Sequence, residues 1–442
     1  MHFFRTVWLL RCCQRRVFVQ SFSSSAAASE QPSPKTSEKS ESGPIQIGSR
    51  IFPRDEWTNI TPRIMAYIGK NIYQQKNHPL WLIKERLVSY FHWKYQTPNR
   101  RSPAFAVVDN VEPVVTTEQN FDCLLVPQDH PSRRPSDSYY INKEHMLRAH
   151  TSAHQRDLMR SGLREFLAVG DVYRRDEIDS THFPVFHQME GVRLRYAHEL
   201  SPDPSFQIFE TTPTKRNPDK QETHTQPAVD LMEKDLKDCL EGAVGSLFGP
   251  KLEMRWNSTY FPFTHPSWEL EVKFKNQWLE LLGCGIMEQK LLNSAGVADQ
   301  IGWAFGVGLE RLAMRLYEIP DIRLFWSTDS GFLSQFDVDN IRKIIKYKPI
   351  SVFPQCINDI AFWIGDKFEK NDFYELVRNL GGELVEQVRL IDEFKHPKTG
   401  ETSNCYRIIY RHMEKTLTKE EANVVHKAIE EAAVQKLGVK IR

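Results

Sequence analysis

Residues 172–191, VYRRDEIDSTHFPVFHQMEG, interleave charged and amide side chains with apolar ones. If PVFHQMEGV forms a strand, Gln188 and Glu190 share one face, because side chains alternate along a strand. A carboxylate and an amide on one face could together bind an ammonium group. Arg174 and Arg175, at the end of the preceding strand, could bind a phosphate or a carboxylate, because a guanidinium donates two parallel hydrogen bonds.

Residues 302–319, GWAFGVGLERLAMRLYEI, could bind an anionic ligand through glycines and the start of a helix. Gly306 and Gly308 would end a strand and let a ligand approach the backbone. An amphipathic helix then begins at Leu309 with Arg311 in its first turn, and a helix N-terminus beside an arginine favours phosphate. The dinucleotide pattern G-x-G-x-x-G is excluded because Arg311 stands where glycine is required, and the chain has no G-x-x-x-x-G-K-[ST].

The ordinary alternative for the first stretch is a hairpin whose charges face water, since structural ion-pair networks look the same in sequence. The elements that must position these residues follow from periodicity. Strands are expected at 167–177, 186–196, 268–274 and 277–286, the last two as a hairpin, and helices at 78–95 and 220–249. Strands next to strands with helices between them predict an α+β fold with a mainly antiparallel sheet.

After a connector at 320–349 the pattern becomes strand, helix, strand, strand, helix, expected at 351–364, 371–382, 384–394, 403–413 and 418–438. This order is that of a split-βαβ, ferredoxin-like module, whose last strand would fall at the very C-terminus. The predicted organisation is a leader with a disordered connector, a catalytic domain, a linker and a ferredoxin-like domain, at 1–44, 45–319, 320–349 and 350–442.

The chain has 442 residues, 40% of them hydrophobic, enough for two or three domains with cores. No apolar run reaches the roughly 18–20 residues of a membrane span, so no membrane partner is expected. The formal net charge of +1 neither requires nor excludes a nucleic-acid partner. Seven cysteines without CxxC spacing suit a reducing compartment and argue against zinc.

Residues 1–29 carry four arginines and several serines, and no acidic residue precedes Glu30. An Arg-rich, Ser-rich, acid-poor start is typical of an organelle transit peptide, with a disordered basic tail as the alternative. The mitochondrial matrix is the expected location.

The two stretches resemble motifs 2 and 3 of the class II aminoacyl-tRNA synthetases, and PVVTTEQNFDCLLVPQDHPSR at 113–133 resembles their motif 1 region. The closer resemblance is to the phenylalanyl-tRNA synthetases, whose catalytic signatures are similar to RAHTSAHQ at 148–155, STHFPVFHQMEG at 180–191 and YFPFTHPSWELEV at 260–272. The C-terminal module resembles their anticodon-binding ferredoxin-like domain. A single chain that carries both behind a transit peptide resembles the mitochondrial form.

The resemblance implies a two-step reaction, in which phenylalanine and ATP form an adenylate and the acyl group then passes to tRNA(Phe). It implies that Arg174 grips the α-phosphate, that Arg311 holds the γ-phosphate end, and that Glu280 faces ATP or Mg²⁺. A buried ion pair is the alternative for Glu280. The other substrate contacts that it implies are Ser152, Ala153, His154 and Gln155, then Thr181, His182 and Phe183 in the ATP-contacting motif 2 loop, and Gln188, Met189 and Glu190.

His150 could join the cluster at 152–155, and an ordinary polar helix start is the alternative there, because Thr151 and Ser152 are common caps. Amino-acid specificity is expected from Phe261 and Phe263, which would share a face and meet the substrate ring. Phe305 could line the pocket or its ATP side, and all three rings could instead be ordinary core. Larger family members carry an editing domain against tyrosine. The predicted modules fill this chain, so no editing is expected.

For tRNA, the candidates are Arg407 and Arg411, on one face of an expected strand, and the basic stretch 342–348. The alternative is a solvated strand face and a linker helix, since residues 350–442 hold 14 Lys/Arg against 15 Asp/Glu. Asp176 departs from motif 2, which usually has glutamate there. The resemblance implies a monomer, with a hinge at 320–349 as a hypothesis.

Two other interpretations remain open at this point. Another adenylate- or amide-forming enzyme on the same core would not need the YFPF run together with Gln188 and Glu190. A non-enzymatic RNA-binding protein predicts loss of Arg174 and Arg311, and both are present.

Overall fold

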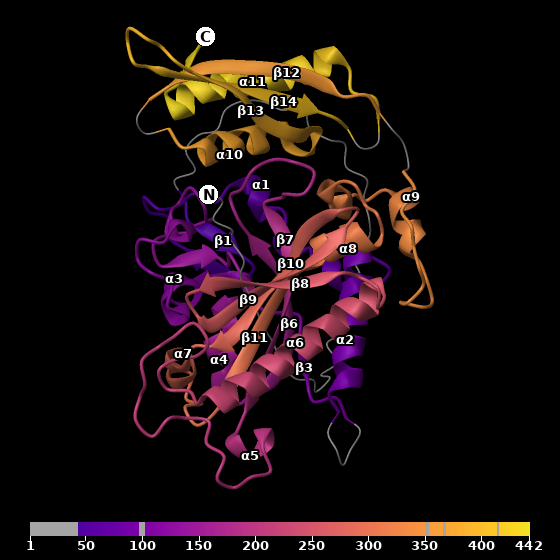
Figure 1. Cartoon of the computed structure of the whole chain (residues 1–442). Helices are drawn as coiled ribbons and strands as arrows, with labels where there is room; N and C mark the ends of the chain where they lie inside the picture. Colours follow the sequence, from indigo (N-terminus) through magenta and orange to yellow (C-terminus); the bar gives the residue numbers. More distant parts are fainter. Residues whose placement is uncertain (1–42, 97–101, 350–352, 366–367, 413–414) are drawn as a thin grey trace.

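The computed structural model describes residues 43–96, 102–349, 353–365, 368–412 and 415–442 (Figure 1). The predicted transit peptide, apart from the last two residues of its connector, lies outside these residues. Within the described ranges no helix has the length and apolar character needed to cross a membrane. The five described cysteines are free thiols.

A seven-stranded sheet forms the centre of the larger domain (Figure 1). All neighbouring strands pair antiparallel except β3 and β6, which are parallel. In spatial order the strands are β3 (Ala106–Val108), β6 (Glu165–Tyr173), β7 (Val185–Arg195), β11 (Ile301–Gly308), β10 (Gln277–Met287), β9 (Thr264–Phe274) and β8 (Met254–Phe261). The predicted α+β class and the predicted β9–β10 hairpin are confirmed. The hairpin turns at Lys275 and Asn276, where φ is 47° and 65°, as a tight two-residue turn requires.

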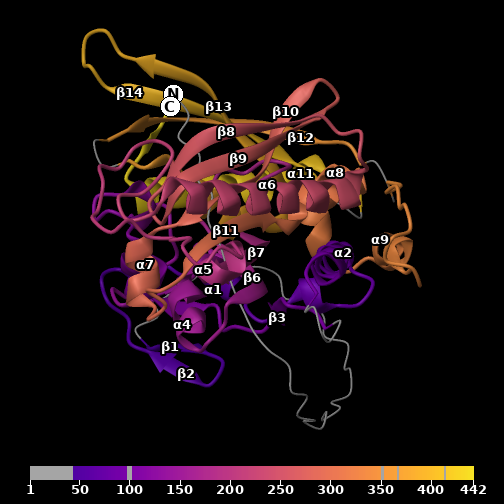
Figure 2. The same ribbon diagram turned by 60° about the horizontal axis from the view of Figure 1, so that its bottom comes forward.

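Three helices cover one face of this sheet, α2 (Pro79–Lys94), α6 (Gln226–Phe248) and α8 (Leu309–Leu316), and Figure 2 shows α6 lying across the strands. The helices α2 and α6 both begin with a proline in their first two positions and with a capping side chain, His78 and Thr225. Phe91 of α2 stacks on Phe305 of β11 at 5.2 Å. The opposite face of the sheet is therefore the one that can hold a ligand, and we call it the site face.

Short elements complete the larger domain. They are β1 (Ile45–Ile47), β2 (Arg50–Phe52), β4 (Val114–Thr116), β5 (His145–Leu147), α1 (Pro62–Met65), α3 (Thr117–Asn120), α4 (Gln155–Arg160), α5 (Ala197–Leu200) and α7 (Gln289–Ser294). β1 pairs with β2, and β4 with β5, both antiparallel. A second hydrophobic cluster joins residues of β1, β2, β4, β5 and α1 and includes Tyr139 and Tyr173.

The segment 320–349 packs against the larger domain. It contains a 3-10 helix at Ile322–Trp326, α9 (Ser330–Leu333) and a 3-10 helix at Ser334–Phe336, and its remainder is irregular. Its buried aromatic side chains belong to the main core, and they are Phe325, Phe332, Phe336 and Tyr347. The basic stretch 342–348 forms no helix, and four of its cations, Arg342, Lys343, Lys346 and Lys348, are exposed.

The C-terminal domain has the predicted split-βαβ order. Its elements are β12 (Cys356–Ile364), α10 (Lys370–Gly381), β13 (Val385–Lys395), β14 (Thr402–Tyr410), α11 (Lys419–Leu437) and β15 (Lys440–Ile441). The short last strand falls at the C-terminus as predicted, and the sheet order β13-β14-β12-β15 places it beside β12. Thr418 and Glu421 form a capping box at the start of α11, and Gly438 ends it with φ 64°.

Candidate active site

Gln188 and Glu190 lie side by side on the site face of β7, and glycines face them across the sheet. Gln188 pairs in register with Gly308, and Glu190 pairs with Gly306, which in turn pairs with Gly283 of β10. Because paired residues project to the same side, these positions form a floor without side chains next to the carboxylate. Glycines at these positions let a ligand approach the backbone beside Gln188 and Glu190.

Glu190 is completely buried and incompletely bonded. One carboxylate oxygen accepts a hydrogen bond from Nε2 of Gln155 at 2.9 Å. Within the described residues no hydrogen bond reaches the other oxygen, Oε2, or the buried Oε1 of Gln188. Burial raises the pKa of Glu190 well above its ordinary value, and the hydrogen bond from Gln155 opposes this only in part. A buried carboxylate with an empty acceptor position is costly, and a cationic donor would satisfy it.

The segment 148–155 reaches this carboxylate through a 3-10 helix at Thr151–His154 that continues into α4. Ser152, Ala153 and Gln155 are buried. The N-cap residues of the two helices are His150 and His154, so neither Thr151 nor Ser152 is the N-cap. Arg148, fully buried, holds the segment in place. It donates to Nε2 of His154 at 3.2 Å and forms an ion pair with Asp171 of β6.

Two phenylalanine rings lie at the end of the β8–β9 hairpin. Phe261 ends β8 and Phe263 follows in the turn, and their ring planes stack with centroids 6.1 Å apart. Both rings are buried. This stacked pair offers an aromatic wall of the kind expected for a phenylalanine side chain.

Phe305 and Met189 are not part of the site face. Phe305 pairs with Gly191 and Met189 pairs with Val307, so both project toward the covering helices. A β-carbon on Gly191 would lie 2.3 Å from the Phe305 ring, which shows how closely that ring covers β7. The suggestion that Phe305 lines the pocket is therefore corrected. Ala304, one residue earlier, projects to the site face.

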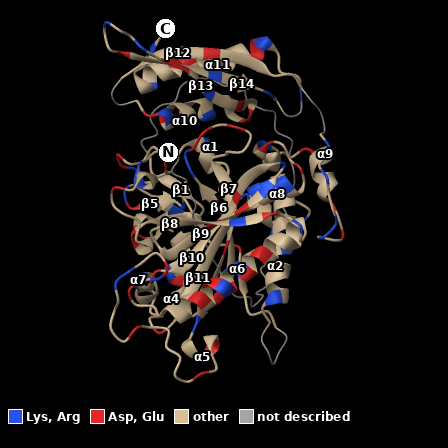
Figure 3. Ribbon diagram, viewed as in Figure 1, with Lys and Arg blue, Asp and Glu red and all other residues tan. Residues whose placement is uncertain are grey.

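Arg311 lies in the first turn of α8, where Figure 3 shows a group of basic residues. Its Nη1 donates to the backbone oxygen and to Oε1 of Glu280 on β10, at 2.8 and 2.9 Å. Glu269 of β9 lies beside this pair, and burial together with the charge of Glu280 raises its pKa. The ion-pair alternative for Glu280 is thus realised, and two carboxylates and a guanidinium stand together at this end of the site face.

On the other face of β7, His187 contacts Glu310 of α8 and holds this helix against the sheet. His187 donates from its backbone N–H to Glu310 at 2.9 Å, and its Nδ1 lies 2.6 Å from the same carboxylate. Both side chains are buried. Glu310 is the neighbour of Arg311, so this contact sets the position of Arg311 relative to Gln188 and Glu190.

Arg174 and Arg175 separate at the end of β6. Arg174 donates from Nε to the carbonyl of Ala149 at 2.7 Å, and its guanidinium carbon lies 5.1 Å from the Phe186 ring centroid. It thus joins the segment that carries Ser152 to Gln155. Arg175 is buried away from it and faces Asp372 of the C-terminal domain at 3.0 Å. The expectation that Arg175 lies beside Arg174 and binds a phosphate is therefore wrong, because Arg175 is paired with the C-terminal domain.

Hydrogen bonds between side chains of the loop 174–184 hold it in one conformation. Asp179 accepts from the hydroxyl of Thr181 at 2.8 Å, and one of its oxygens lies 2.8 Å from Nδ1 of His182. Although burial favours the neutral acid, the hydrogen bonds from His182 and Thr181 lower the pKa of Asp179 to about 2, and the same contact raises the pKa of His182. Phe183 is packed between Tyr67, at 5.5 Å edge-on, and Trp326, stacked at 5.8 Å.

Comparisons with known proteins identify the family of this chain. A family model described as tRNA synthetases class II core domain (F) matches residues 64–202 and 228–336, and one described as Ferredoxin-fold anticodon binding domain matches 351–442. The protein of Mus musculus named phenylalanine--tRNA ligase, mitochondrial, is 56% identical over 403 residues, covering 90% of this chain and 89% of that protein. The chain belongs to the phenylalanine--tRNA ligases.

Two relatives with lower sequence identity match a similar share of this chain. A Drosophila melanogaster protein named probable phenylalanine--tRNA ligase, mitochondrial, is 52% identical over 427 residues, covering 91% of this chain and 94% of its own. The Saccharomyces cerevisiae mitochondrial ligase is 38% identical over 458 residues, covering 90% and 95%. The predicted family, the enzyme class and the two predicted domain types are confirmed.

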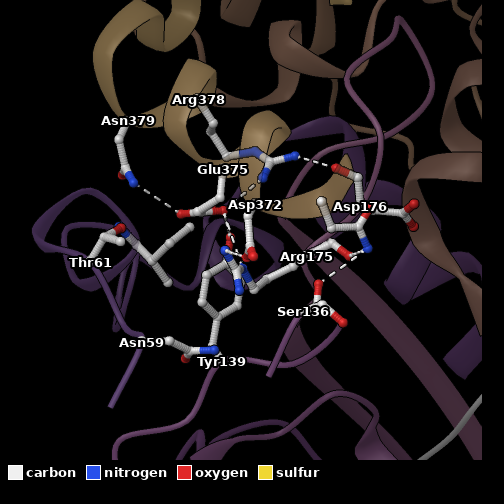
Figure 4. Close-up of polar contacts among 12 residues, drawn as sticks. Asn59, Thr61, Ser136, Tyr139, Arg175, Asp176, Asp372, Glu375, Arg378 and Asn379 are labelled. Atoms are coloured by element: carbon white, nitrogen blue, oxygen red, sulfur yellow. Dashed lines mark hydrogen bonds and ion pairs between the residues drawn. The ribbon is translucent and has the colours of Figure 1, made fainter. Parts of the chain in front are cut away.

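In this ligase the C-terminal domain docks on the motif 2 loop (Figure 4). Glu375 of α10 accepts from the hydroxyl of Tyr139 at 2.6 Å and from Arg378 at 2.8 Å, and Nε of Arg175 lies 3.9 Å from it. Arg378 also donates to the backbone oxygen of Asp176 at 2.6 Å. Ile178, from the same loop, is buried in the core of the C-terminal domain. The loop 174–184, for which the resemblance implies ATP contacts, is therefore also a domain interface.

Several residues of this ligase site escaped the sequence analysis. Arg148, Asp171, His187 and Glu310 are buried charged or polar side chains. Arg148 contacts His154 and pairs with Asp171, and His187 pairs with Glu310. Because side chains alternate along β7, His187 projects to the other face of the sheet from Gln188, toward the covering helices. Nothing local in the sequence marks Arg148. No group of three or more His, Cys, Asp or Glu side chains suited to a metal occurs among the described residues.

Proposed function

We propose that this ligase attaches L-phenylalanine to mitochondrial tRNA(Phe), using ATP, through a phenylalanyl-adenylate. The buried carboxylate of Glu190, with one oxygen open and Gln188 beside it, carries the proposal. The ammonium group of an amino acid supplies both a positive charge and several N–H donors for these acceptors. The stacked rings of Phe261 and Phe263 favour an aromatic side chain.

In the first step the substrate carboxylate attacks the α-phosphate of ATP and pyrophosphate leaves. Arg174 stabilises the charge that develops on the α-phosphate, and its bond to Ala149 ties it to the segment that reaches Glu190. Arg311 holds the far phosphates from the first turn of α8. Positioning of the two reactants on one rigid sheet lowers the entropic part of the barrier.

Mg²⁺ fits the end of the site where Glu280 and Glu269 lie. The charge of Glu280 contributes to the raised pKa of Glu269, which reflects repulsion that a divalent cation would offset. Carboxylates are the ligands that Mg²⁺ prefers, and bound with ATP it would supply positive charge at the phosphates. Arg311, paired to Glu280, would then be freed to meet phosphate.

The test is ATP–pyrophosphate exchange by the full-length protein with each amino acid in turn. Phenylalanine is expected to support exchange strongly and tyrosine weakly, since an apolar pocket rejects an added hydroxyl only about 10²-fold. Arg174→Ala should abolish the exchange with phenylalanine. Arg160 is an exposed arginine on α4, and the control variant Arg160→Ala should keep the exchange activity. Exchange with a different amino acid would overturn the substrate. No exchange from folded protein would favour an RNA-binding role.

The proposal includes a monomer in the mitochondrial matrix that does not edit Tyr-tRNA(Phe). The helices and strands of the described residues belong to the two domains and the segment 320–349, and no editing activity is proposed for them. Hydrolysis of Tyr-tRNA(Phe) by the purified protein would contradict it. Sedimentation would report the oligomeric state.

The proposal also includes a hinge motion of the C-terminal domain, because one tRNA must reach both domains. The motion would have to release the docking of α10 on the motif 2 loop. Small-angle scattering with and without tRNA should show different domain separations, and identical profiles would dismiss the motion.

A further inference from the structure

The segment 203–227 lies between the two stretches that the family model of the class II core matches. All of it is described, and before α6 begins at Gln226 it contains neither a helix nor a strand. Hydrogen bonds nevertheless hold it together from within. The buried Nζ of Lys220 donates to the carboxylate of Glu210 at 2.6 Å and to the hydroxyl of Thr214 at 2.8 Å. The segment therefore has a fixed conformation and can position what it contacts.

Gln221 connects this segment to the catalytic sheet, and its side chain is buried. Its Nε2 donates to the backbone oxygens of His265 on β9 and Met287 on β10, at 2.8 and 2.9 Å. Its Oε1 accepts from the backbone N–H of Gln289, the first residue of α7, at 2.9 Å. A primary amide offers two donors and an acceptor at its end, whereas a carboxylate offers no donor and a thioether only a weak acceptor. This set of three contacts therefore requires an amide side chain.

The backbone that Gln221 holds carries the aromatic wall of the site. Phe263 precedes His265 by two residues, and its backbone oxygen accepts from the N–H of Glu288 at 2.9 Å. Glu288 lies in the chain between the two other partners of Gln221, so Gln221 bonds on both sides of the contact that holds Phe263. Arg216, from the same segment, forms an ion pair with the carboxylate of Glu288. The segment thus clamps the turn of Phe263 at two points.

The same turn lies over the site face, close to the buried carboxylate. Gly283 and Gly285 of β10 share this face, and Gly283 lies in the cross-strand row that contains Glu190. A β-carbon on Gly285 would lie 2.7 Å from the β-carbon of Thr264 and 2.6 Å from the backbone oxygen of Pro266. The start of β9 therefore covers the sheet one row away from Glu190. A displacement of this turn would change the shape of the site itself.

We propose that Gln221 is a positioning residue of the amino-acid pocket, because it fixes how far the wall of Phe263 stands from Gln188 and Glu190. This rests on the proposed function, which makes phenylalanine the substrate. An aromatic amino acid held by its ammonium group needs this wall at a fixed distance, since packing attraction falls steeply as a gap opens. A wall that can move would accept side chains of other lengths. Gln221 thus contributes to the selection of the amino acid through the turn, not by contact with the substrate.

The test measures ATP–pyrophosphate exchange by full-length Gln221→Met, which keeps the size of the side chain and removes its donors. The KM for phenylalanine should rise about tenfold, because the turn loses two hydrogen bonds, whereas the KM for ATP should stay the same. The ratio of kcat/KM for phenylalanine to that for tyrosine should fall several-fold, because the wall gives way to the larger side chain. Gln207→Met, at an exposed position on the same segment, is the matched control and should leave all three values unchanged.

Arg216→Met tests the same clamp from a side chain that is 40% exposed, so it decides the matter if thermal unfolding shows that Gln221→Met does not fold. It should raise the KM for phenylalanine by a smaller factor, again without a change in the KM for ATP. An unchanged KM for phenylalanine in the folded variant would overturn the inference. Equal rises in both KM values would also overturn it, because they would indicate a general loosening of the domain.

Failure of the proposed function is read separately, in the wild-type protein, as absence of exchange with phenylalanine. A wild type that exchanges with phenylalanine, together with folded variants whose KM for phenylalanine is unchanged, would defeat this inference alone.

Discussion

At the scale of single residues, Glu190 combines a cost in stability with a role in binding. Its carboxylate is buried with one oxygen open, so Glu190→Gln should leave the melting temperature unchanged or raise it. Exchange with phenylalanine should fall about 10–100-fold, because a hydrogen bond to a charged group contributes about 1.5–3 kcal/mol. Calorimetry and exchange assays measure the two effects. Glu56→Gln, at an exposed position, is the control, and full exchange activity in Glu190→Gln would refute the role.

Phenylalanine binding should also release a proton from Glu190. Because its folded-state pKa is raised, the free protein keeps this proton at pH values above the ordinary range of a glutamic acid. An ammonium group favours the charged carboxylate, so affinity should rise with pH between the ordinary and the raised pKa. The native state holds more protons there than the unfolded state, so the stability of the free protein should decline over the same window.

Calorimetric titration in buffers with different ionisation enthalpies counts the released proton. The release should disappear in Glu190→Gln. A binding enthalpy that is independent of the buffer in the wild type would show that Glu190 is already ionised.

At the scale of elements, α6 provides a matched pair of glycines. A β-carbon on Gly242 would lie 2.1 Å from the Tyr90 hydroxyl oxygen of α2, whereas nothing lies within 4 Å of one on Gly245. Gly242→Ala should therefore destabilise the packing of α6 on α2 by about 1–3 kcal/mol. Gly245→Ala should stabilise the helix by about 0.5–1 kcal/mol. The melting temperature should fall in Gly242→Ala and rise in Gly245→Ala. Changes of the same sign in both variants would contradict the close packing of α6 on α2.

At the scale of the whole molecule, a few charged side chains hold the two domains together. Glu375 lies among Tyr139, Arg378 and Arg175, and its carboxylate is buried. Glu375→Gln removes the charge that both guanidiniums face, and breaking a buried ion pair typically costs about 3–5 kcal/mol. The domains should therefore separate more readily, which scattering would report as a larger radius of gyration. Glu431→Gln, exposed on α11, is the control, and identical profiles for both variants would contradict this role.

Periodicity and motif spacing were enough to predict the main strands, the long helices and the C-terminal βαββαβ order. These features depend on residues close together in the chain, such as the alternation that places Gln188 and Glu190 on one face. The binding of an anionic ligand could also be predicted from the sequence, because the stretches 172–191 and 302–319 contain the arginines and the glycines. The position of the last strand, at Lys440–Ile441, was correct for the same reason.

Only the tertiary structure decided which of these residues meet. The register of β7 against β11 turns Phe305 toward Phe91, and the docking of α10 takes Arg175 away from Arg174. The aromatic residues of 320–349 join the main core, and Ser403 brings Trp363 and Phe394 together from strands that are not neighbours. Each of these outcomes depends on side chains far apart in sequence, whose packing and pairing energies no local pattern contains.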